Sequence, residues 1–325
     1  MVLHAASIKK FRVCAIVVSY FPDVVLLQRV IEASLPQVDN LVIVDNTPGD
    51  GAGLAFAEQP GALVTVLRQG RNIGVAAALN VGVQFARSTL ATHYLFLDQD
   101  SLPAPDMVTN LCLAWSEATG NRIQVAAVGP AFSDERGGAP PPFIKVHFPC
   151  NQIVHPTAGI SFVRTNVLIT SGSLVSEDAL ASIGLMNEWL FIDNVDIEWG
   201  FRAQALGWHL IGAPQARLSH RIGDDHLVAP TWARWFFRRK IAVRHSDFRL
   251  YYIFRNRVAL YRLATIPYLW KLQDLIRLPF KIALCLSISP KPGYTGKRLF
   301  TGMRDGLIGQ QTTQKALGQK KQDPL

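Results

Sequence analysis

The feature that most constrains the fold is a series of short apolar runs, each followed by residues with helical spacing. The run at 13–19, VCAIVVS, is continuous and rich in β-branched residues, as strands buried on both faces of a parallel sheet are. Similar runs occupy 41–46, 63–67 and 93–100, and a helix fits from about 74 to 87. Strands that alternate with helices imply parallel βαβ crossovers. We therefore expect an α/β fold with a doubly wound, mostly parallel sheet.

The chain between residue 100 and about 245 is expected to extend this α/β domain. Two further pairs of elements fit: a helix at 103–116 with a strand at 125–129, and a strand at 160–170 with a helix at 191–206. The stretch 132–156 contains DERGGAPPP and has little periodicity, so we expect a long exposed loop there.

The composition changes beyond residue 230, where aromatic and basic residues interleave over 232–257. Pro267 and Pro279 then divide apolar helical segments. The charged residues of these segments fall on one face: Lys271, Asp274, Arg277 and Lys281. This pattern is typical of helices that lie in a membrane interface, and a helical subdomain packed on the core is the alternative. We expect an amphipathic region at 246–308, associated with membrane and acceptor, and a disordered tail at 309–325.

Charge and length restrict the possible partners and location. The formal charge of +9 favours phosphates, anionic lipids or nucleic acid, and charge alone does not choose among them. No segment offers the roughly twenty uninterrupted apolar residues that cross a bilayer. The N-terminus has no long apolar run of the kind found in secretory signals. The protein is thus expected to stay in the cytosol, without a transmembrane helix, and to lie on a membrane surface.

Two carboxylates, Asp98 and Asp100, end the apolar run LFLDQD. Open α/β folds bind their ligands at the carboxyl edge of the sheet, where both side chains can reach one hard cation. Mg²⁺ and Mn²⁺ prefer oxygen ligands and bridge to phosphates, so this pair suits a nucleotide diphosphate. By itself the pair is a weak signal, because an aspartate after a strand also caps helices and turns.

Two other segments strengthen this interpretation. Asp45 ends a predicted strand, where its carboxylate can accept hydrogen bonds from a base or ribose. Residues 71–74, RNIG, open a predicted helix whose free backbone N–H groups and dipole favour anions.

Three acidic residues, Asp193, Asp196 and Glu198, lie near the start of the predicted helix at 191–206. Acidic residues are favoured there by the helix dipole, and this explanation fits Asp193 well. It fits Asp196 less well, because Asp196 has apolar neighbours on both sides and a carboxylate in such surroundings is costly unless it has a task.

Six ordered blocks carry a resemblance to a known family. They are the strand with SYFP at 16–22, VDN at 44–46, RNIGVAAALNVG at 71–82, LDQD at 97–100, SG at 171–172 and FIDNVDIEWGFRAQALGW at 191–208. Together they resemble the inverting GT-A glycosyltransferases of family 2, and most of all the bacterial rhamnosyltransferases that build O-antigen or other cell-surface polysaccharide. The resemblance covers roughly residues 12 to 260.

The resemblance implies a role for each matching residue. Base and ribose would be contacted by Tyr20 and Asp45, the phosphates by Asn72, and the metal by Asp98, Asp100 and His220, with Asp98 also at the nucleotide sugar. Asp196 matches the carboxylate that removes the proton of the acceptor hydroxyl. Inversion by a single displacement needs such a base opposite the leaving nucleotide. Glu198 is a possible substitute for the base or a supporting neighbour.

The acceptor side is less defined. Family members often have an acidic pair before the FID block, whereas this chain has only Glu188 there, which leaves open whether Glu188 orients the acceptor. The basic and aromatic stretch 232–257 could suit stacked bases. A polyprenyl-diphosphate acceptor explains the stretch better, with Arg255 gripping the diphosphate, so we expect no nucleic-acid partner.

The leading hypothesis is transfer of L-rhamnose from dTDP-L-rhamnose to a lipid-linked glycan at the cytoplasmic face of the inner membrane, with Mg²⁺ or Mn²⁺ as cofactor. A UDP-hexose or galactofuranose donor is the nearest alternative, because a few pocket contacts decide the donor. A sugar-phosphate nucleotidyltransferase is disfavoured, because SYFP follows the first strand in place of a glycine-rich loop with arginine. An inactive binding protein is disfavoured because Asp98, Asp100, Asp196 and His220 are all present.

Overall fold

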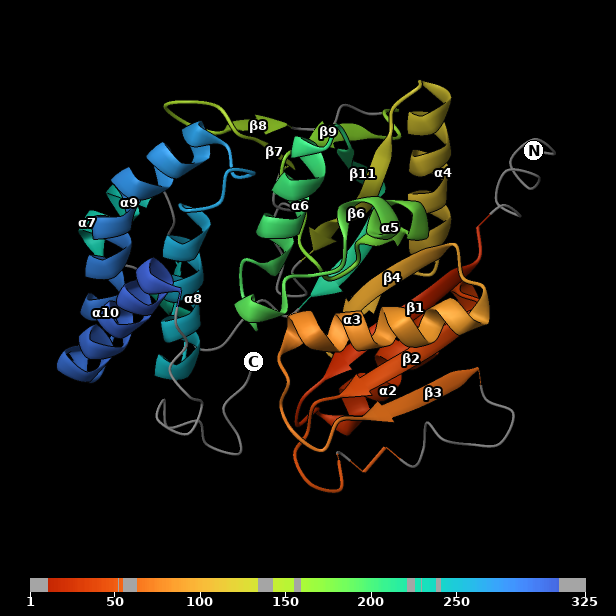
Figure 1. Cartoon of the computed structure of the whole chain (residues 1–325), viewed down its shortest axis with the longest axis horizontal. Helices are drawn as coiled ribbons and strands as arrows, with labels where there is room; N and C mark the ends of the chain where they lie inside the picture. The colour runs from red at the N-terminus through yellow and green to blue at the C-terminus, as the bar shows by residue number, and fades with distance from the viewer. Residues whose placement is uncertain are drawn as a thin grey trace. The chain divides into compact units, whose positions relative to one another are not determined.

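The computed structural model describes residues 11–51, 53–54, 63–133, 143–154, 159–220, 226–228, 230–237 and 241–309. The chain forms two compact units (Figure 1). The first, here called the α/β unit, comprises 1–145, 151–191 and 195–221; the second, the helical unit, comprises 146–150, 192–194 and 222–325. The main part of the helical unit thus begins at residue 222, before the predicted boundary at 245. The unit also includes two short segments from the middle of the sequence.

The α/β unit is built on a nine-stranded sheet with the order β3-β2-β1-β4-β10-β6-β11-β5, and β9 pairs with β11. The strands are β1 (Val13–Ser19), β2 (Asn40–Asp45), β3 (Val64–Arg68), β4 (His93–Asp98), β5 (Ser101–Pro103), β6 (Val125–Ser133), β9 (Val163–Thr165), β10 (Leu174–Ser176) and β11 (His209–His220). The six longer strands run in one direction, because β10 is antiparallel to both β4 and β6. The predicted α/β class with a mostly parallel sheet is confirmed.

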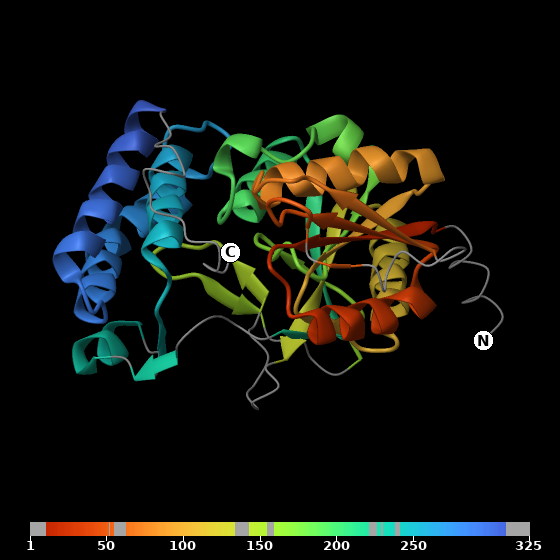
Figure 2. The same ribbon diagram turned by 90° about the horizontal axis from the view of Figure 1, so that it is seen from below.

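Helices cover both faces of this sheet (Figure 2). They are α2 (Val24–Ser34), α3 (Val75–Ala86), α4 (Met107–Gly120), α5 (Glu177–Ile183) and α6 (Val195–Ala205). Alternate residues of β1 point to opposite sides, with Val17 packing in the core of α2 and α4 and Ile16 in the core of α3, α5 and α6. Burial on both faces explains why the run at 13–19 is continuously apolar.

Three predicted elements differ from the structure. The stretch 132–156 is not a continuous loop, because β7 (Phe143–Lys145) pairs with β8 (Gln152–Val154). The strand predicted at 160–170 is reduced to the three residues of β9. The helix predicted from residue 191 begins at Val195, because Phe191, Asp193 and Asn194 have φ values of 64°, 62° and 60° that an α-helix does not contain.

The helical unit contains α7 (Thr231–Phe237), α8 (Asp247–Leu260), α9 (Tyr268–Ser287) and α10 (Pro292–Ile308), with a small sheet of β12 (His226–Val228) and β13 (Ile241–Val243). Two glycines of α10 lie against the backbone of α8. A Cβ atom at Gly302 would lie 2.4 Å from the carbonyl oxygen of Tyr251, and one at Gly306 would lie 2.2 Å from that of Arg255. The absence of side chains at these positions lets the two helices approach closely.

The helix α9 runs through Pro279, so this proline does not divide two segments as predicted, whereas Pro267 does mark the start of α9. Of the helices that the structure describes, none combines the length and apolar character needed to cross a membrane. The predicted tail lies, from residue 310 onward, outside the described residues.

Candidate active site

The carboxyl ends of three neighbouring strands bring the predicted donor residues to one edge of the sheet. Ser19 of β1 pairs with Asp45 of β2, and Val18 of β1 pairs with Asp98 of β4. Tyr20 directly follows β1 and is buried. Parallel register therefore places Tyr20, Asp45 and Asp98 at the same edge, as open α/β sheets require of a ligand site.

The turn that carries Asp98 and Asp100 is fixed by a serine of the SG block. The hydroxyl of Ser171 accepts a hydrogen bond from the backbone N–H of Asp98 at 3.0 Å and donates one to the hydroxyl of Ser101 at 2.7 Å. Because Ser171 is buried and contacts both sides of the turn, it holds the two aspartates in place.

The second residue of this block, Gly172, has a φ of 78° and donates its N–H to the carbonyl of Phe96 at 2.7 Å. A Cβ atom there would lie 2.6 Å from Cγ of Pro130 and 2.8 Å from Cδ2 of Leu218. Only glycine fits this position, so the SG block is a support for LDQD.

The carboxylate of Asp45 is fully buried and already fixed by its neighbours. Its Oδ1 accepts hydrogen bonds from the backbone N–H of Thr47 at 3.0 Å and from the hydroxyl of Ser19 at 3.2 Å. Its Oδ2 faces Gly51, where a Cβ atom would lie only 2.8 Å away. Only a glycine at 51 lets this part of the chain pack so closely against the carboxylate.

The start of α3 is tied to the sheet edge and to the FID block. Asn72 is buried, and its Oδ1 accepts a hydrogen bond from the N–H of Gly74 at 3.0 Å. The carbonyl of Gly74 accepts one from the Asn46 side chain at 3.2 Å. Gly74 lies so close to Phe191 that a Cβ atom would come within 2.5 Å of its ring, and Ala76 N–H bonds the Phe191 carbonyl at 3.2 Å. The RNIG block and the FID block, more than one hundred residues apart in the sequence, are thus in contact at the start of α3.

Asp196 lies in the first turn of α6 and is half-buried. Its Oδ1 accepts a hydrogen bond from the N–H of Ile197 at 2.8 Å. It lines a small, mostly apolar pocket together with Phe96, Met186 and Trp199. The carboxylate is therefore held in the first turn of α6, at one wall of this pocket.

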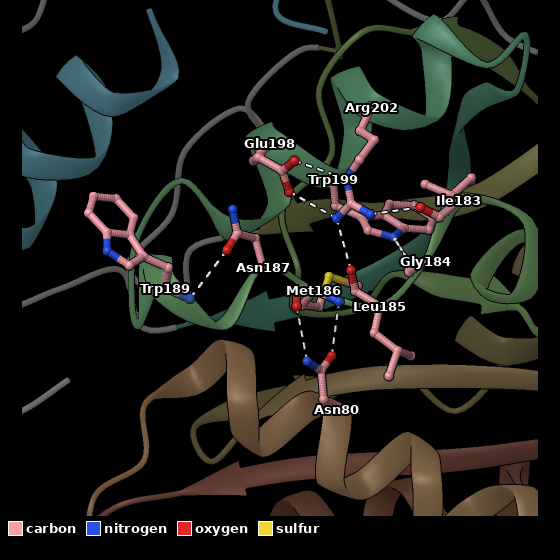
Figure 3. A network of polar contacts seen from close by, with 10 residues as sticks. All are labelled: Asn80, Ile183, Gly184, Leu185, Met186, Asn187, Trp189, Glu198, Trp199 and Arg202. Atoms are coloured by element: carbon pink, nitrogen blue, oxygen red, sulfur yellow. Dashed lines mark hydrogen bonds and ion pairs between the residues drawn. The ribbon is translucent and has the colours of Figure 1, made fainter. Parts of the chain in front are cut away.

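Glu198, the possible substitute for the base, is buried and engaged with Arg202 (Figure 3). Its two oxygens accept hydrogen bonds from Nε at 2.9 Å and Nη2 at 3.0 Å of that arginine. The same guanidinium donates to the carbonyls of Ile183 at 2.7 Å and Leu185 at 2.8 Å. This arrangement favours a structural role for Glu198, because it orients the arginine that joins α6 to the end of α5.

Asn80 is a supporting residue that was not among the predicted site residues. Its side chain donates to the carbonyl of Met186 at 2.9 Å and accepts from the N–H of Met186 at 2.9 Å (Figure 3). It also donates to Oε1 of Glu188 at 2.9 Å. The exposed Glu188 is thus oriented from α3. The signal was present in RNIGVAAALNVG, where one amide interrupts an apolar helix face.

For three predicted residues the structure shows no side chain at this edge. The backbone of His220 pairs with Ser101, one residue after Asp100, but its side chain lies outside what the structure describes. Asp193 and Arg255 belong to the helical unit, where Arg255 is fully buried. Within the described ranges, no group of three or more His, Cys, Asp or Glu side chains gathers as a metal site.

Comparison with known proteins agrees with this geometry. The family described as Glycosyl transferase family 2 matches residues 15–169. The chain contains a glycosyl transferase family 2 domain. Tyr20, Asp45, Asn72, Asp98 and Asp100 lie within the matched range, whereas Asp196 and His220 lie beyond it.

One relative and one solved structure extend the match. The chain is 29% identical over 266 residues to the dTDP-rhamnosyl transferase RfbF of Shigella flexneri, which covers 81% of this chain and 84% of the relative. The crystal structure of GalNAc-T7 with UDP, GalNAc and Mn²⁺ is similar at a TM-score of 0.53 and 14% identity, over 82% of this chain. The similar region is 54% of that protein, so the chain spans about half its length, and the likeness concerns the fold alone. The predicted GT-A fold and glycosyltransferase class are confirmed.

Proposed function

We propose that this family 2 glycosyltransferase transfers L-rhamnose from dTDP-L-rhamnose, with inversion, to a lipid-linked glycan acceptor in O-antigen or related polysaccharide synthesis. The observation that carries the proposal is the shared edge of β1, β2 and β4, which gathers Tyr20, Asp45 and Asp98. The choice of rhamnose is supported by the similarity to a dTDP-rhamnosyl transferase over most of both chains.

The donor would bind along this edge. Tyr20 and Asp45, which lie at the adjacent ends of β1 and β2, would contact the base and ribose. Asn72 and the start of α3 would lie near the diphosphate, because the N-terminal N–H groups of a helix favour anions.

The residues at the β4 turn fit a divalent cation, Mg²⁺ or Mn²⁺. Asp98 and Asp100 supply the oxygen donors that such ions prefer, on a turn that Ser171 fixes, and His220 follows in register beside Ser101. When bound, the cation would neutralise the charge on the departing nucleoside diphosphate.

Asp196 would act as the base. The acceptor oxygen forms a bond to the anomeric carbon as the bond to the nucleoside diphosphate breaks, and the hydroxyl proton passes to the Asp196 carboxylate. Glu188, held by Asn80 at 2.9 Å, would orient the acceptor sugar. A single displacement of this kind inverts the anomeric centre without a covalent intermediate.

The proposed membrane contact is supported by the unusual arrangement of α9, whose polar side chains point inward. Asp274 is buried and accepts hydrogen bonds from Lys281 at 2.7 Å, from the Tyr261 hydroxyl at 2.6 Å and from Arg257. Gln273 is also buried and bonds the carbonyl of His147. Asp274 on the charged face of this helix is therefore paired within the helical unit.

The opposite face of α9 is exposed and apolar. Tyr268, Leu275, Ile276 and Phe280 are exposed by 74%, 56%, 51% and 38%. Residues 241–309 also contain 12 Lys and Arg against three Asp and no Glu, a surplus equal to that of the whole chain. An exposed apolar helix face in a strongly basic region suits an anionic bilayer surface. We place the enzyme at the cytoplasmic face of the inner membrane, attached peripherally.

Arg255, expected from the sequence to grip the acceptor diphosphate, is not placed to do so. Its side chain is fully buried, with the guanidinium 4.7 Å from the ring centroid of Tyr252. A buried guanidinium is not accessible to an acceptor diphosphate, so we assign Arg255 to the interior support of α8.

The donor is tested with purified full-length protein and a panel of dTDP-rhamnose, UDP-hexoses and UDP-galactofuranose, with and without Mn²⁺. We expect release of TDP from dTDP-rhamnose that depends on the cation and increases with a lipid-linked acceptor. Release from UDP-sugars alone would overturn the rhamnose assignment and leave the enzyme class intact.

The membrane contact is tested by co-sedimentation with phosphatidylglycerol-containing vesicles. The double variant Leu275→Asp and Ile276→Asp should bind vesicles much more weakly than the unaltered protein. Leu206→Asp is the matched control, because Leu206 is an equally exposed leucine of the α/β unit at 55%. Equal sedimentation of all three proteins would refute α9 as the membrane contact.

A further inference from the structure

The segment Ile192–Asn194, which the chain runs through directly before α6, has an uncommon backbone conformation. Asp193 and Asn194 have φ values of 62° and 60°, and Phe191 before them has 64°. Residues with a side chain rarely adopt the left-handed region, and three such residues within four positions persist only where the surroundings hold them.

Two side chains of α8 hold this segment. The Asn256 amide donates hydrogen bonds to the carbonyl oxygens of Ile192 at 2.7 Å and of Asp193 at 2.8 Å. Arg249 forms a two-point ion pair with the Asp193 carboxylate, from Nε to Oδ2 and from Nη2 to Oδ1, both at 3.1 Å. The backbone and the side chain of the segment are thus fixed separately, by different residues of one helix.

The orientation of the Asn256 side chain is fixed by its neighbour Arg255. Nε and Nη2 of the buried Arg255 donate to its Oδ1 at 2.9 Å and 2.7 Å. Arg255 lies over the ring of Tyr252, and burial lowers the pKa of its guanidinium while Tyr251 and Tyr252 act in the opposite direction. Because the arginine takes the amide oxygen, the amide nitrogen must face the segment. Arg255 thus selects the side chain orientation that delivers both donors.

Both donors of Asn256 are used on the carbonyls of Ile192 and Asp193, and Asp193 lies three positions before Asp196 in the chain. We propose that Asn256 and Arg249 are positioning residues for the transfer reaction: they hold Ile192–Asn194 in the conformation from which α6, and with it Asp196, begins. This inference rests on the proposed role of Asp196 as the base.

The expected consequence is a loss of turnover without a loss of donor binding. If the hold is weakened, the segment relaxes towards ordinary φ values and the first turn of α6 shifts. Displacement of a reacting group by about 1 Å can cost roughly 100-fold in rate. Tyr20, Asp45 and Asn72 belong to other elements, so the affinity for the nucleotide should stay within about twofold.

The test compares Arg249→Lys and Asn256→Asp with the unaltered full-length enzyme. Arg249→Lys keeps the charge and loses the two-point pairing, and Asn256→Asp keeps the shape and loses both donors. Arg298→Lys is the matched control, because Arg298 contacts Tyr294 on an exposed face of α10 in the same unit. We expect turnover to fall by 10-fold or more for the first two variants and to be unchanged for the control. If Asn256→Asp fails to fold, Arg249→Lys carries the test, since Arg249 lies at the rim of the network.

A double variant separates positioning from general damage. Where Arg249 acts through Asp196, the substitution Arg249→Lys should cost little further turnover in an Asp196→Asn background. An equal cost in both backgrounds, or no cost in the unaltered enzyme, would overturn the positioning role. If Asp196→Asn itself retains full transfer, the proposed base is wrong, an outcome that is distinct from failure of the α8 contacts alone.

Discussion

The side-chain oxygen of Gln99 accepts a hydrogen bond from the backbone N–H of Tyr20 at 2.7 Å. The middle residue of LDQD thus joins the turn after β4 to the end of β1. The two predicted halves of the donor site, the residue expected at the base and the aspartates expected at the metal, are connected through this one amide.

Replacing this amide should weaken nucleotide binding. Gln99→Ala leaves the partly buried Tyr20 N–H without its acceptor, which typically costs about 1–3 kcal/mol. We expect a lower free energy of unfolding and several-fold weaker binding of TDP by calorimetry. Gln99→Glu keeps an acceptor oxygen and should lose less. Equal TDP affinity for the alanine variant and the unaltered protein would show that this contact does not organise the donor site.

The serine beneath the aspartates should control metal use. Ser171→Ala removes both the acceptor for Asp98 N–H and the donor to Ser101, so the concentration of Mn²⁺ needed for half-maximal activity should rise. Ser34→Ala is the control, because Ser34 is a buried serine whose hydroxyl bonds the Val30 carbonyl in α2. A metal dependence that shifts equally in both variants would contradict the role of Ser171.

A methyl group at the start of α3 should destabilise the fold. Gly74 has a φ of 85°, and a Cβ atom there would lie 2.5 Å from the Phe191 ring and 2.7 Å from the Phe191 carbonyl oxygen. We expect Gly74→Ala to lower the free energy of unfolding by more than about 1 kcal/mol. In contrast, a Cβ atom at Gly120, the last residue of α4, meets no atom within 4 Å, so Gly120→Ala should be neutral or slightly stabilising. Urea unfolding of the two variants provides the comparison.

Lys281, a half-buried lysine of α9, should make stability depend on pH. Burial, with a smaller contribution from Arg257, lowers the pKa of Lys281 from 10.5 to about 8, although Asp274 acts in the opposite direction. Between these two values the unfolded chain binds more protons than the folded one, so the free energy of unfolding rises with pH in that window. Lys281→Met should lack this rise when unfolding is measured at pH 8 and pH 10. The same pH slope in both proteins would contradict a depressed pKa.

Much of the fold follows from local pattern. The buried strands could be predicted because both faces of β1, β2 and β4 are covered, which requires continuous apolar residues. The position of Asp45 and Asp98 then follows from the parallel direction of the strands, because the carboxyl ends of parallel strands lie at the same edge of a sheet. The pairing of Glu198 with Arg202 was also visible, as an acid and a base four residues apart on a helix.

The features that escaped prediction depend on distant residues. The hairpin of β7 and β8 begins at Phe143, whose ring lies against Gly212 so closely that a Cβ there would come within 2.3 Å. The late start of α6 depends on Asn256, more than sixty residues away. The burial of Arg255 depends on the glycines of α10, which let that helix lie directly on α8. Each of these contacts joins residues that are far apart in the sequence, so the local pattern of apolar and polar residues does not reveal it.

The central claim is that Asp196 takes the proton of the acceptor hydroxyl while the nucleotide leaves from the edge of β4. The most direct measurement is the turnover of Asp196→Asn with dTDP-rhamnose and a lipid-linked acceptor, together with its affinity for TDP. We predict that turnover falls by about 100-fold to 10,000-fold, because the base is lost, while TDP affinity stays within about twofold. Transfer by Asp196→Asn at the unaltered rate would contradict the account.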